Sequence, residues 1–211
     1  VGQQPEPATG LIAATIESLA RTLPESTSER VVVVDGTPVE DALAGRLASI
    51  AEEHAGMAVK SWREADDAVA SFHTELKDRL ANGKEDDPTR VLMLHGLQRF
   101  RGLRTVEDFS FSASEGPPAP DKQFEELLRD GPTVGLHVIT WCDSVTNLNR
   151  TIARGTLRDF ELKVLLQMSA ADSSLLVDAP AAAQLGGARA LLSIEETNQL
   201  EKFRPYRLRS S

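Results

Sequence analysis

The chain has 211 residues, of which 41% are hydrophobic and 26% charged, the mixture of a soluble globular protein with enough length for one sizeable domain. Its formal net charge of -9 argues against a free-standing nucleic-acid binder of the strongly basic kind. The single cysteine, Cys142, excludes an internal disulfide and a cysteine-based zinc site, so we expect it to be buried packing.

Short apolar runs alternate along the chain with segments of helical periodicity. The runs predict strands at 31–35, 91–94, 134–141, 163–168 and 188–194. Apolar residues recur every three or four positions over 12–23, 65–80 and around 123–128, which predicts helices. This alternation predicts a three-layer α/β fold, with a mainly parallel central sheet and helices on both faces. Residues 109–121, rich in Ser, Gly and Pro, predict an irregular, flexible surface excursion within a single domain spanning 1–211.

Ligands of such a fold bind beyond the carboxyl ends of the strands, so the residues that follow each apolar run are the informative ones. Four stretches qualify: GQQPEPAT (2–9), DGTP (35–38), HGLQRF (95–100) and CDS (142–144). The first would follow a strand of which only Val1 remains. Because the chain lacks an initiator Met and a secretion signal, we expect Val1 to be an internal position of a longer protein.

The stretch GQQPEPAT has the length of a phosphate-binding P-loop and is followed at once by an amphipathic segment. Gly2 takes the place of the first glycine and Thr9 that of the magnesium-binding hydroxyl, but Pro7 and Ala8 replace the second glycine and the lysine. Proline offers no N–H to a phosphate, and alanine lacks the positive charge. We therefore expect nucleotide binding to be weak or absent. In the alternative interpretation Thr9 simply caps a helix beginning near Gly10. The residues of the candidate loop are Gly2, Gln3, Gln4, Ala8 and Thr9.

After the run VLML the sequence departs a second time from the pattern of a P-loop ATPase. A P-loop ATPase needs an acidic residue here to hold magnesium, and usually a second one to orient water. His95 and Gly96 occupy those positions. A neutral imidazole is a poor substitute for a carboxylate on a hard cation, and glycine offers no base. We expect His95 to be a hydrogen-bonded histidine of the core or its rim, and no metal site.

Residues 135–192 resemble the second half of the motor domain of the FtsK/SpoIIIE family of DNA translocases, a RecA-like P-loop NTPase fold, and the resemblance extends backwards over nearly the whole chain. Segments 31–38, 65–80 and 91–96 match a strand, the long helix and the Walker B strand of that family. GLQRFRGLR and EKFRPY resemble a less studied bacterial branch, large ATP-binding proteins with several such domains in succession. The landmarks of the resemblance are Gly135, Leu136, His137, Gln167, Ser169, Asp172, Ser173, Leu176, Val177, Asp178, Gln184, Leu185 and Gly186.

The resemblance implies ATP and magnesium as cofactors of the family, yet this chain departs from the family at its nucleotide site. The glycine and lysine of Walker A, the two acids of Walker B and a strand-end Gln are replaced by Pro7, Ala8, His95, Gly96 and Asp143. We therefore expect this chain to keep the fold of the family, to have lost ATP hydrolysis, and to leave ATP and magnesium unbound.

Two groups of arginines are candidates for contacts with partners. Arg150, Arg154 and Arg158 would line one face of a continuous helix and could follow DNA phosphates, although Gly155 interrupts such a helix. A solvated or inter-subunit face is the alternative.

The second group, Arg99, Arg101 and Arg104, follows the predicted 91–94 strand. These residues could be offered in trans to the ATP of another subunit. Alternatively, they pair on the surface with Glu107, Asp108 and their neighbours.

Three hypotheses follow for the function. The first is a degenerate ATPase domain with a structural or regulatory role in a larger FtsK/SpoIIIE-like assembly. The second is an active DNA translocase domain, with an improvised magnesium site made by Thr9, Asp35 and Asp143. The third is a protein-translocating motor of the type VII secretion kind, which the net acidity favours.

The expected partners are other FtsK-like domains of the same polypeptide or of a homo-oligomeric ring, with double-stranded DNA as a further candidate. We expect a bacterial, cytoplasmic domain that does not itself insert into a membrane, whose full-length protein could be membrane-associated.

Overall fold

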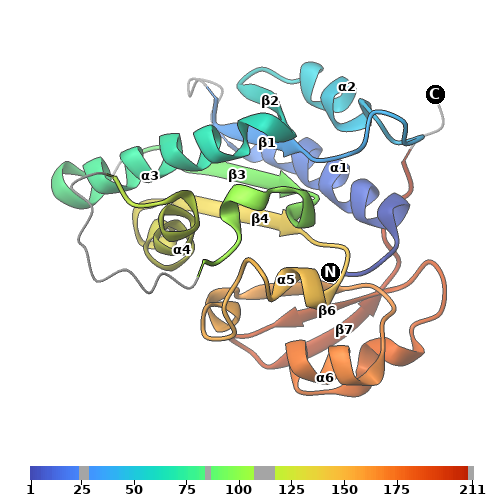
Figure 1. The fold of residues 1–211 in the computed structure, drawn as a ribbon. Helices are drawn as coiled ribbons and strands as arrows, with labels where there is room; N and C mark the ends of the chain where they lie inside the picture. Colours follow the sequence, from blue (N-terminus) through green and yellow to red (C-terminus); the bar gives the residue numbers. More distant parts are fainter. Residues whose placement is uncertain (24–28, 84–86, 107–116, 209–211) are drawn as a thin grey trace.

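The central feature is a parallel sheet of four strands (Figure 1). The computed structural model describes residues 1–23, 29–83, 87–106 and 117–208. The strands lie in the order β2-β1-β3-β4, and every neighbouring pair is parallel. Their bounds are β1 (Val31–Asp35), β2 (Met57–Ser61), β3 (Arg90–His95) and β4 (Leu136–Trp141). The predicted strands at 31–35, 91–94 and 134–141 are confirmed, whereas β2 was not predicted.

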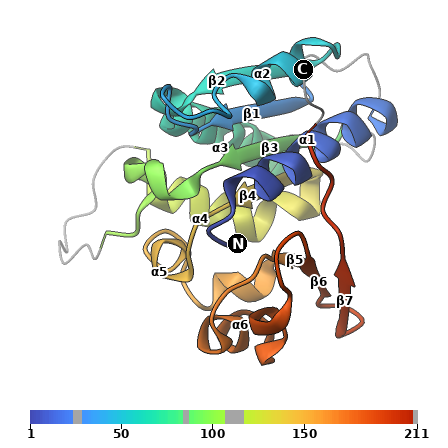
Figure 2. The ribbon, with the colours of Figure 1, turned by 90° about the vertical axis from the view of Figure 1, so that its right-hand side faces the viewer.

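Helices cover both faces of this sheet, which confirms the three-layer arrangement (Figures 1 and 2). Side chains alternate along a strand, so β1 and β3 each contribute to two cores. On one face Val31, Val33, Val91 and Met93 pack with α1 (Pro5–Thr22) and α2 (Arg46–Glu52). On the other face Val32, Val34, Leu92 and Leu94 pack with α3 (Ala65–Asn82) and α4 (Pro120–Asp130).

Three further strands form a separate antiparallel sheet in the order β5-β6-β7. They are β5 (Leu162–Leu165), β6 (Ala190–Ile194) and β7 (Gln199–Phe203). The predicted strands at 163–168 and 188–194 therefore exist, but they are shorter and lie outside the parallel sheet. A short apolar run indicates burial without indicating the direction of its partner. The direction of β7 is set by a tight turn, in which Asn198 has a φ of 50°.

The connections contain short helices. The α-helices α5 (Val145–Leu148) and α6 (Ala170–Val177) precede and follow β5. The 3₁₀ helices are η1 (Trp62–Glu64), η2 (Leu97–Arg99), η3 (Arg101–Leu103), η4 (Gly131–Val134), η5 (Thr156–Asp159) and η6 (Pro180–Gln184). The predicted excursion over 109–121 is too long at its end, because Pro120 begins α4, and positions 109–116 lie outside the described residues. Proline favours the first turn of a helix, where its missing N–H has no helical partner.

The two ends of the chain tie the antiparallel sheet to the rest of the molecule. The Val1 amine donates to the Val164 carbonyl oxygen, the Leu166 N–H donates to the Val1 carbonyl oxygen, and Gly2 donates to Cys142. Residues 204–208 then run from β7 back across α1 (Figure 2). They cross so closely at Gly10 that an added Cβ there would lie 2.3 Å from the Tyr206 carbonyl oxygen.

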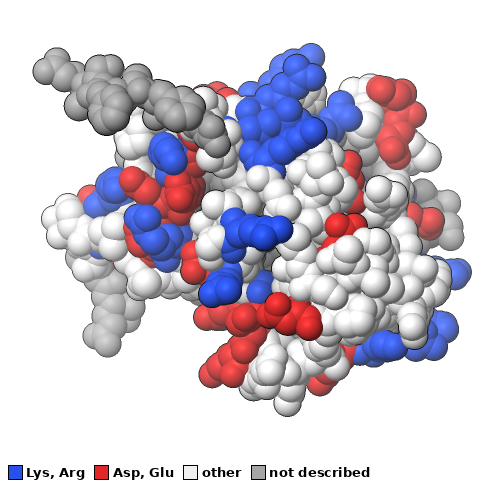
Figure 3. All heavy atoms as spheres, turned by 60° about the horizontal axis from the view of Figure 1, so that its bottom comes forward, with Lys and Arg blue, Asp and Glu red and all other residues white. Residues whose placement is uncertain are grey.

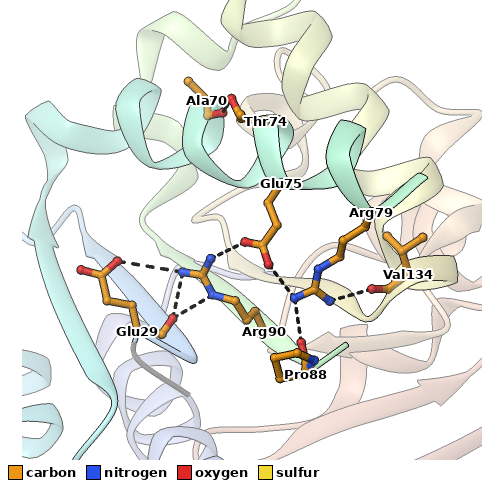
Figure 4. A network of polar contacts seen from close by, with 8 residues as sticks. All are labelled: Glu29, Ala70, Thr74, Glu75, Arg79, Pro88, Arg90 and Val134. Atoms are coloured by element: carbon orange, nitrogen blue, oxygen red, sulfur yellow. Dashed lines mark hydrogen bonds and ion pairs between the residues drawn. The ribbon is translucent and has the colours of Figure 1, made fainter. Parts of the chain in front are cut away.

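A polar network fixes α3 to the start of β3 (Figure 4). The carboxylate of Glu75 accepts hydrogen bonds from both Arg79, at 2.5 Å, and Arg90. Arg79 also donates to the carbonyl oxygens of Pro88 and Val134, each at 2.8 Å. The side chains of Arg79 and Arg90 are only 6% and 15% exposed, so the Glu75 carboxylate is the close anion of two guanidinium groups largely out of water, and the exposed Glu29 carboxylate lies 3.9 Å from Arg90.

Two further expectations can be compared with the fold. Cys142 is buried as expected, and this burial raises the pKa of its thiol to about 11. No helix within the described ranges is long and apolar enough to cross a membrane.

Candidate functional site: a histidine network at the sheet edge

The parallel register brings polar residues together where the strands end. Asp35 is paired with His95 across β1 and β3, and His95 is paired with Trp141 across β3 and β4. The rings of His95 and Trp141 stack, with centroids 4.7 Å apart and an interplanar angle of 24°. Three adjacent strand ends thus present a carboxylate, an imidazole and an indole side by side, with His95 itself almost fully buried.

The start of α1 completes this cluster through Thr9. Its hydroxyl oxygen, Oγ1, lies 3.2 Å from His95 Nε2, and its hydroxyl donates to the Pro5 carbonyl oxygen at 2.8 Å. With its only proton used in this way, Thr9 Oγ1 can only accept from His95, so Nε2 carries a hydrogen. The predicted Thr9 side-chain cap is wrong, because the helix begins at Pro5 and Gln4 is its N-cap.

On the opposite side of the ring, His95 Nδ1 faces two oxygen atoms. Asp35 Oδ1 and Thr37 Oγ1 each lie 3.3 Å from it, while the Thr37 hydroxyl donates to Asp35 Oδ1 at 2.6 Å. The His95 ring thus lies between the Thr9 hydroxyl on its Nε2 side and the oxygens of Asp35 and Thr37 on its Nδ1 side.

The ionisation of Asp35 is supported by its surroundings. Burial alone would raise the pKa of this carboxyl, but the hydrogen bonds from His95 and Thr37 outweigh burial and hold the pKa below its usual value. We call the set Thr9, Asp35, Thr37, His95 and Trp141 the histidine cluster.

This shift predicts a pH-dependent effect of Asp35→Asn. A lowered folded-state pKa means that Asp35 stabilises the fold above its ordinary value of 3.8, and that this contribution is lost as pH falls below it. We expect the variant to be less stable than the unaltered chain by about 1.5 kcal/mol at pH 7. The difference should shrink towards pH 2.5 in urea unfolding curves. Asp159→Asn, at an exposed position, is the control, and a gap that stays constant with pH contradicts the prediction.

The first turn of α1 offers few backbone donors. Pro5 and Pro7 have no N–H, and the Ala8 N–H donates to the Gln4 carbonyl oxygen at 3.3 Å. Among the described residues, Glu6 is thus the one member of this turn whose N–H is neither missing nor bonded, and its side chain adds a negative charge. The loop between Gly2 and the helix consists of Gln3 and Gln4 alone.

The remaining predicted site residues are not all part of the cluster. Gly96 follows β3 with a φ of 90° and begins η2. The carboxylate of Asp143 accepts from Ser144 and Asn147, and its N–H donates to the Gln98 side chain. These contacts join Asp143 to η2 and to the start of α5. Within the described ranges, no group of three or more His, Cys, Asp or Glu side chains is placed to hold a metal.

A cavity of about 170 Å³ opens beside the histidine cluster. Its walls come from the start of α1, the segment after β1 and the strand ends. The lining residues are Pro5, Gly36, Thr37, Pro38, Asp41, Leu43, His95, Gln98, Arg99 and Trp141. Pockets for small ligands usually measure roughly 300–1,000 Å³, so this cavity is small for a whole nucleotide.

The expected helical row of Arg150, Arg154 and Arg158 does not form. Helix α5 ends at Leu148 and Arg158 lies in η5, which leaves the other two arginines in the connection between them. All three are exposed. On the face shown in Figure 3, Lys and Arg side chains form separate groups interspersed with acidic ones. Neither the placement of these arginines nor the charges on this face form a continuous basic surface.

The sequence landmarks in the second half of the chain have structural roles. Ser169 caps α6 by accepting the Asp172 N–H at 3.1 Å. The buried hydroxyl of Ser173 donates to Ala179 at 2.6 Å and accepts from Ala182 at 3.1 Å. Asp178 ends the helix with a φ of 54°. These residues thus shape the connection between β5 and β6.

The parallel sheet, its two helical layers and the site at its carboxyl edge define the fold of a P-loop ATPase domain. No family model matches the chain, and no curated protein matches it.

Solved structures share this fold. The DNA-packaging ATPase B204 from Sulfolobus turreted icosahedral virus is similar over 97% of this chain and 94% of its own, with a TM-score of 0.63 and 12% identity. ATPases 2 and 3 of EccC from Thermomonospora curvata, in complex with a signal sequence peptide, give a TM-score of 0.68 at 14% identity. ATPases 2 and 3 of EssC from Geobacillus thermodenitrificans give 0.61 at 13%. Nearly all of this chain aligns with the latter two, but only 36% and 40% of theirs is covered.

Proposed function

We propose that this chain is a P-loop-fold domain that does not hydrolyse ATP and that has a structural or regulatory role in a larger FtsK/SpoIIIE-like assembly. Its partners would be other domains of the same fold, in the same polypeptide or in a ring. The observation that carries the proposal is the histidine cluster, which fills the position where an active site needs free magnesium ligands.

The phosphate side of the site supports this proposal. A P-loop binds phosphate through successive backbone N–H groups, a lysine and the positive end of the following helix. In this chain the helix begins at Pro5, two N–H groups of its first turn are absent, and Ala8 carries no charge. The Glu6 carboxylate, in the same turn, would repel a phosphate. The residues present do not fit a triphosphate as that motif binds it.

The residues at the positions of the magnesium ligands also support the proposal that the chain does not hydrolyse ATP. Magnesium prefers oxygen ligands in octahedral geometry, and its usual carboxylate is replaced by His95. The Thr9 hydroxyl, which would be a ligand, is engaged by Pro5 and His95. The Asp35 carboxylate is engaged by Thr37 and His95. We therefore derive no catalytic step through magnesium or ATP.

Among assemblies of this fold, we favour one that acts on protein over one that moves DNA. The chain carries a net charge of -9, and its exposed arginines 150, 154 and 158 are dispersed over two short elements. A polyanion such as DNA is attracted by continuous basic surfaces. The likeness to the EccC ATPases, whose structure contains a signal sequence peptide, is compatible with a protein partner.

The test combines a measurement of ATP hydrolysis with measurements of ATP binding in the presence and absence of magnesium. We expect the unaltered chain to release no phosphate from ATP above the rate of a buffer blank. We expect Pro7→Gly combined with Ala8→Lys to raise the affinity for ATP at least about tenfold both with and without magnesium, because the variant regains an N–H and a charge for the phosphates. Isothermal titration with and without magnesium measures this change. Turnover by the unaltered chain that disappears in Thr9→Val and Asp35→Asn would refute the proposal.

A further inference from the structure

A second, larger hollow lies on the other side of η2 from the histidine cluster. Its volume is about 660 Å³, within the range of small-molecule pockets. Two segments far apart in sequence form its walls, η1 with the start of α3, and η2 with η3. The lining residues are Trp62, Arg63, Asp66, Gln98, Arg99, Phe100, Arg101, Gly102 and Arg104. We call this site the arginine hollow.

The arginines lie on a segment in which every third residue is buried. Leu97 in η2, Phe100 between the two helices and Leu103 in η3 are at most 2% exposed. These anchors hold the segment against the core. The intervening Arg99 and Arg101 are left outside, where both are exposed. The core thus fixes the segment that presents the charges.

The positive charge of the hollow is not balanced from within the described part of the chain. Its lining includes four arginines and one aspartate, which leaves a net charge of +3 on a protein of net charge -9. None of the four arginines forms an ion pair with a described residue. Two of them are nevertheless positioned: Arg104 donates to the Gln98 carbonyl oxygen at 2.9 Å, and Arg63 lies 4.6 Å from the Trp62 ring centroid.

The one acid in the hollow, Asp66, does not neutralise it. Its carboxylate lies against the backbone of η3, so that a Cβ on Gly102 would be 2.1 Å from Asp66 Oδ2. Burial and the neighbouring charge of Asp67 raise the pKa of Asp66, whereas an arginine partner would lower it. Within the described residues, no carboxylate therefore pairs with the four guanidinium groups, and the proposed partners Glu107 and Asp108 lie outside those residues.

We propose that the arginine hollow binds a compact, multiply phosphorylated small molecule. Guanidinium groups bind phosphate oxygens through paired, charge-assisted hydrogen bonds, and several converging arginines suit a ligand with more than one phosphate. The bounded volume fits a small molecule. A long polyanion would extend beyond the hollow over a surface of net negative charge, which disfavours DNA. The arginine hollow shares Gln98 and Arg99 with the smaller cavity beside the histidine cluster, but this proposal does not depend on the proposed function.

Inorganic triphosphate without magnesium is the probe, because it reports on the arginines and not on a magnesium-ATP site. We expect isothermal titration to detect binding to the unaltered chain. Arg63→Gln combined with Arg101→Gln should weaken this binding at least about tenfold. Arg150→Gln combined with Arg154→Gln is the matched control, because it removes the same charge from exposed positions outside the hollow. We expect its affinity to stay within about twofold of the unaltered chain.

Fluorescence locates the ligand independently. The chain has two tryptophans, of which Trp62 lines the arginine hollow and Trp141 belongs to the histidine cluster. We expect triphosphate to change the emission of the unaltered chain and to have no such effect in Trp62→Phe. The absence of binding by the unaltered chain, or an equal loss in both double-arginine variants, overturns the proposal. Tighter binding of duplex DNA or of an acidic peptide at the same arginines also overturns it.

Discussion

Replacing Glu75 with alanine is expected to lower the free energy of unfolding by about 3 kcal/mol, because the change leaves two largely buried cations without their shared anion. Arg79 and Arg90 both donate to this carboxylate, and their side chains are 6% and 15% exposed (Figure 4). Arg90 would keep a long contact, 3.9 Å, with the exposed carboxylate of Glu29, and the other remaining acceptors are backbone carbonyl oxygens, which carry no compensating charge. Urea unfolding at neutral pH measures the loss.

The chain provides a matched control for this variant. Glu17 and Arg21 form the same glutamate-to-arginine pair at a spacing of four residues, but on the exposed side of α1. Removal of an exposed pair usually costs less than about 1 kcal/mol, so Glu17→Ala should have little effect. Similar losses in the two variants would show that burial of the Glu75 network contributes nothing to stability.

Gly36→Ala is expected to destabilise the fold by about 2 kcal/mol, because there is no room for a methyl group between the ends of β1 and β3. A Cβ at Gly36 would lie 2.6 Å from the His95 carbonyl oxygen and 3.2 Å from that of Gly96. Both neighbours are backbone atoms, so relief requires the strands to separate. Since Asp35 precedes Gly36, this separation should also lengthen the contact between Asp35 and His95.

Thermal and urea unfolding measure the effect on stability, and the NMR shifts of the His95 ring report on the cluster. Gly155→Ala is the control, because Gly155 has a helical φ of -60° and no atom within 4 Å of an added Cβ. This control should be neutral or stabilised by about 0.5 kcal/mol. A Gly36→Ala variant as stable as the control contradicts the proposed close packing of the strand ends.

The buried strands of the parallel sheet were predictable because continuous apolar runs are their direct signature. Strand β2 was missed because its MAVKS sequence is half-buried and mixes polar with apolar residues. Strand β7 was missed because QLEKF is largely exposed. Apolar runs say nothing of strand direction, so the antiparallel pairing of β5 with β6 also lay beyond sequence reasoning.

At the site, sequence reasoning identified Thr9, Asp35 and His95 because each follows or replaces a motif position. It missed Thr37 and Trp141, whose roles depend on the register between strands. A signal for Trp141 was present, since it ends the predicted strand at 134–141 and adjacent parallel strands end at the same edge. The sequence pattern placed Pro5 and Pro7 in a loop and the start of the helix near Gly10, whereas α1 begins at Pro5. Both prolines are compatible with the first turn of a helix.

The return of residues 204–208 across α1 has a mechanical consequence. Leu208 packs against the core on the α1 face, and the Tyr206 backbone lies against Gly10 (Figure 2). Tension applied at the end of this segment would therefore load α1 in shear before it reached the β6–β7 hairpin. Helix α1, which contributes Thr9 to the histidine cluster, thus lies on the path by which a pull on one end of the protein would reach that cluster.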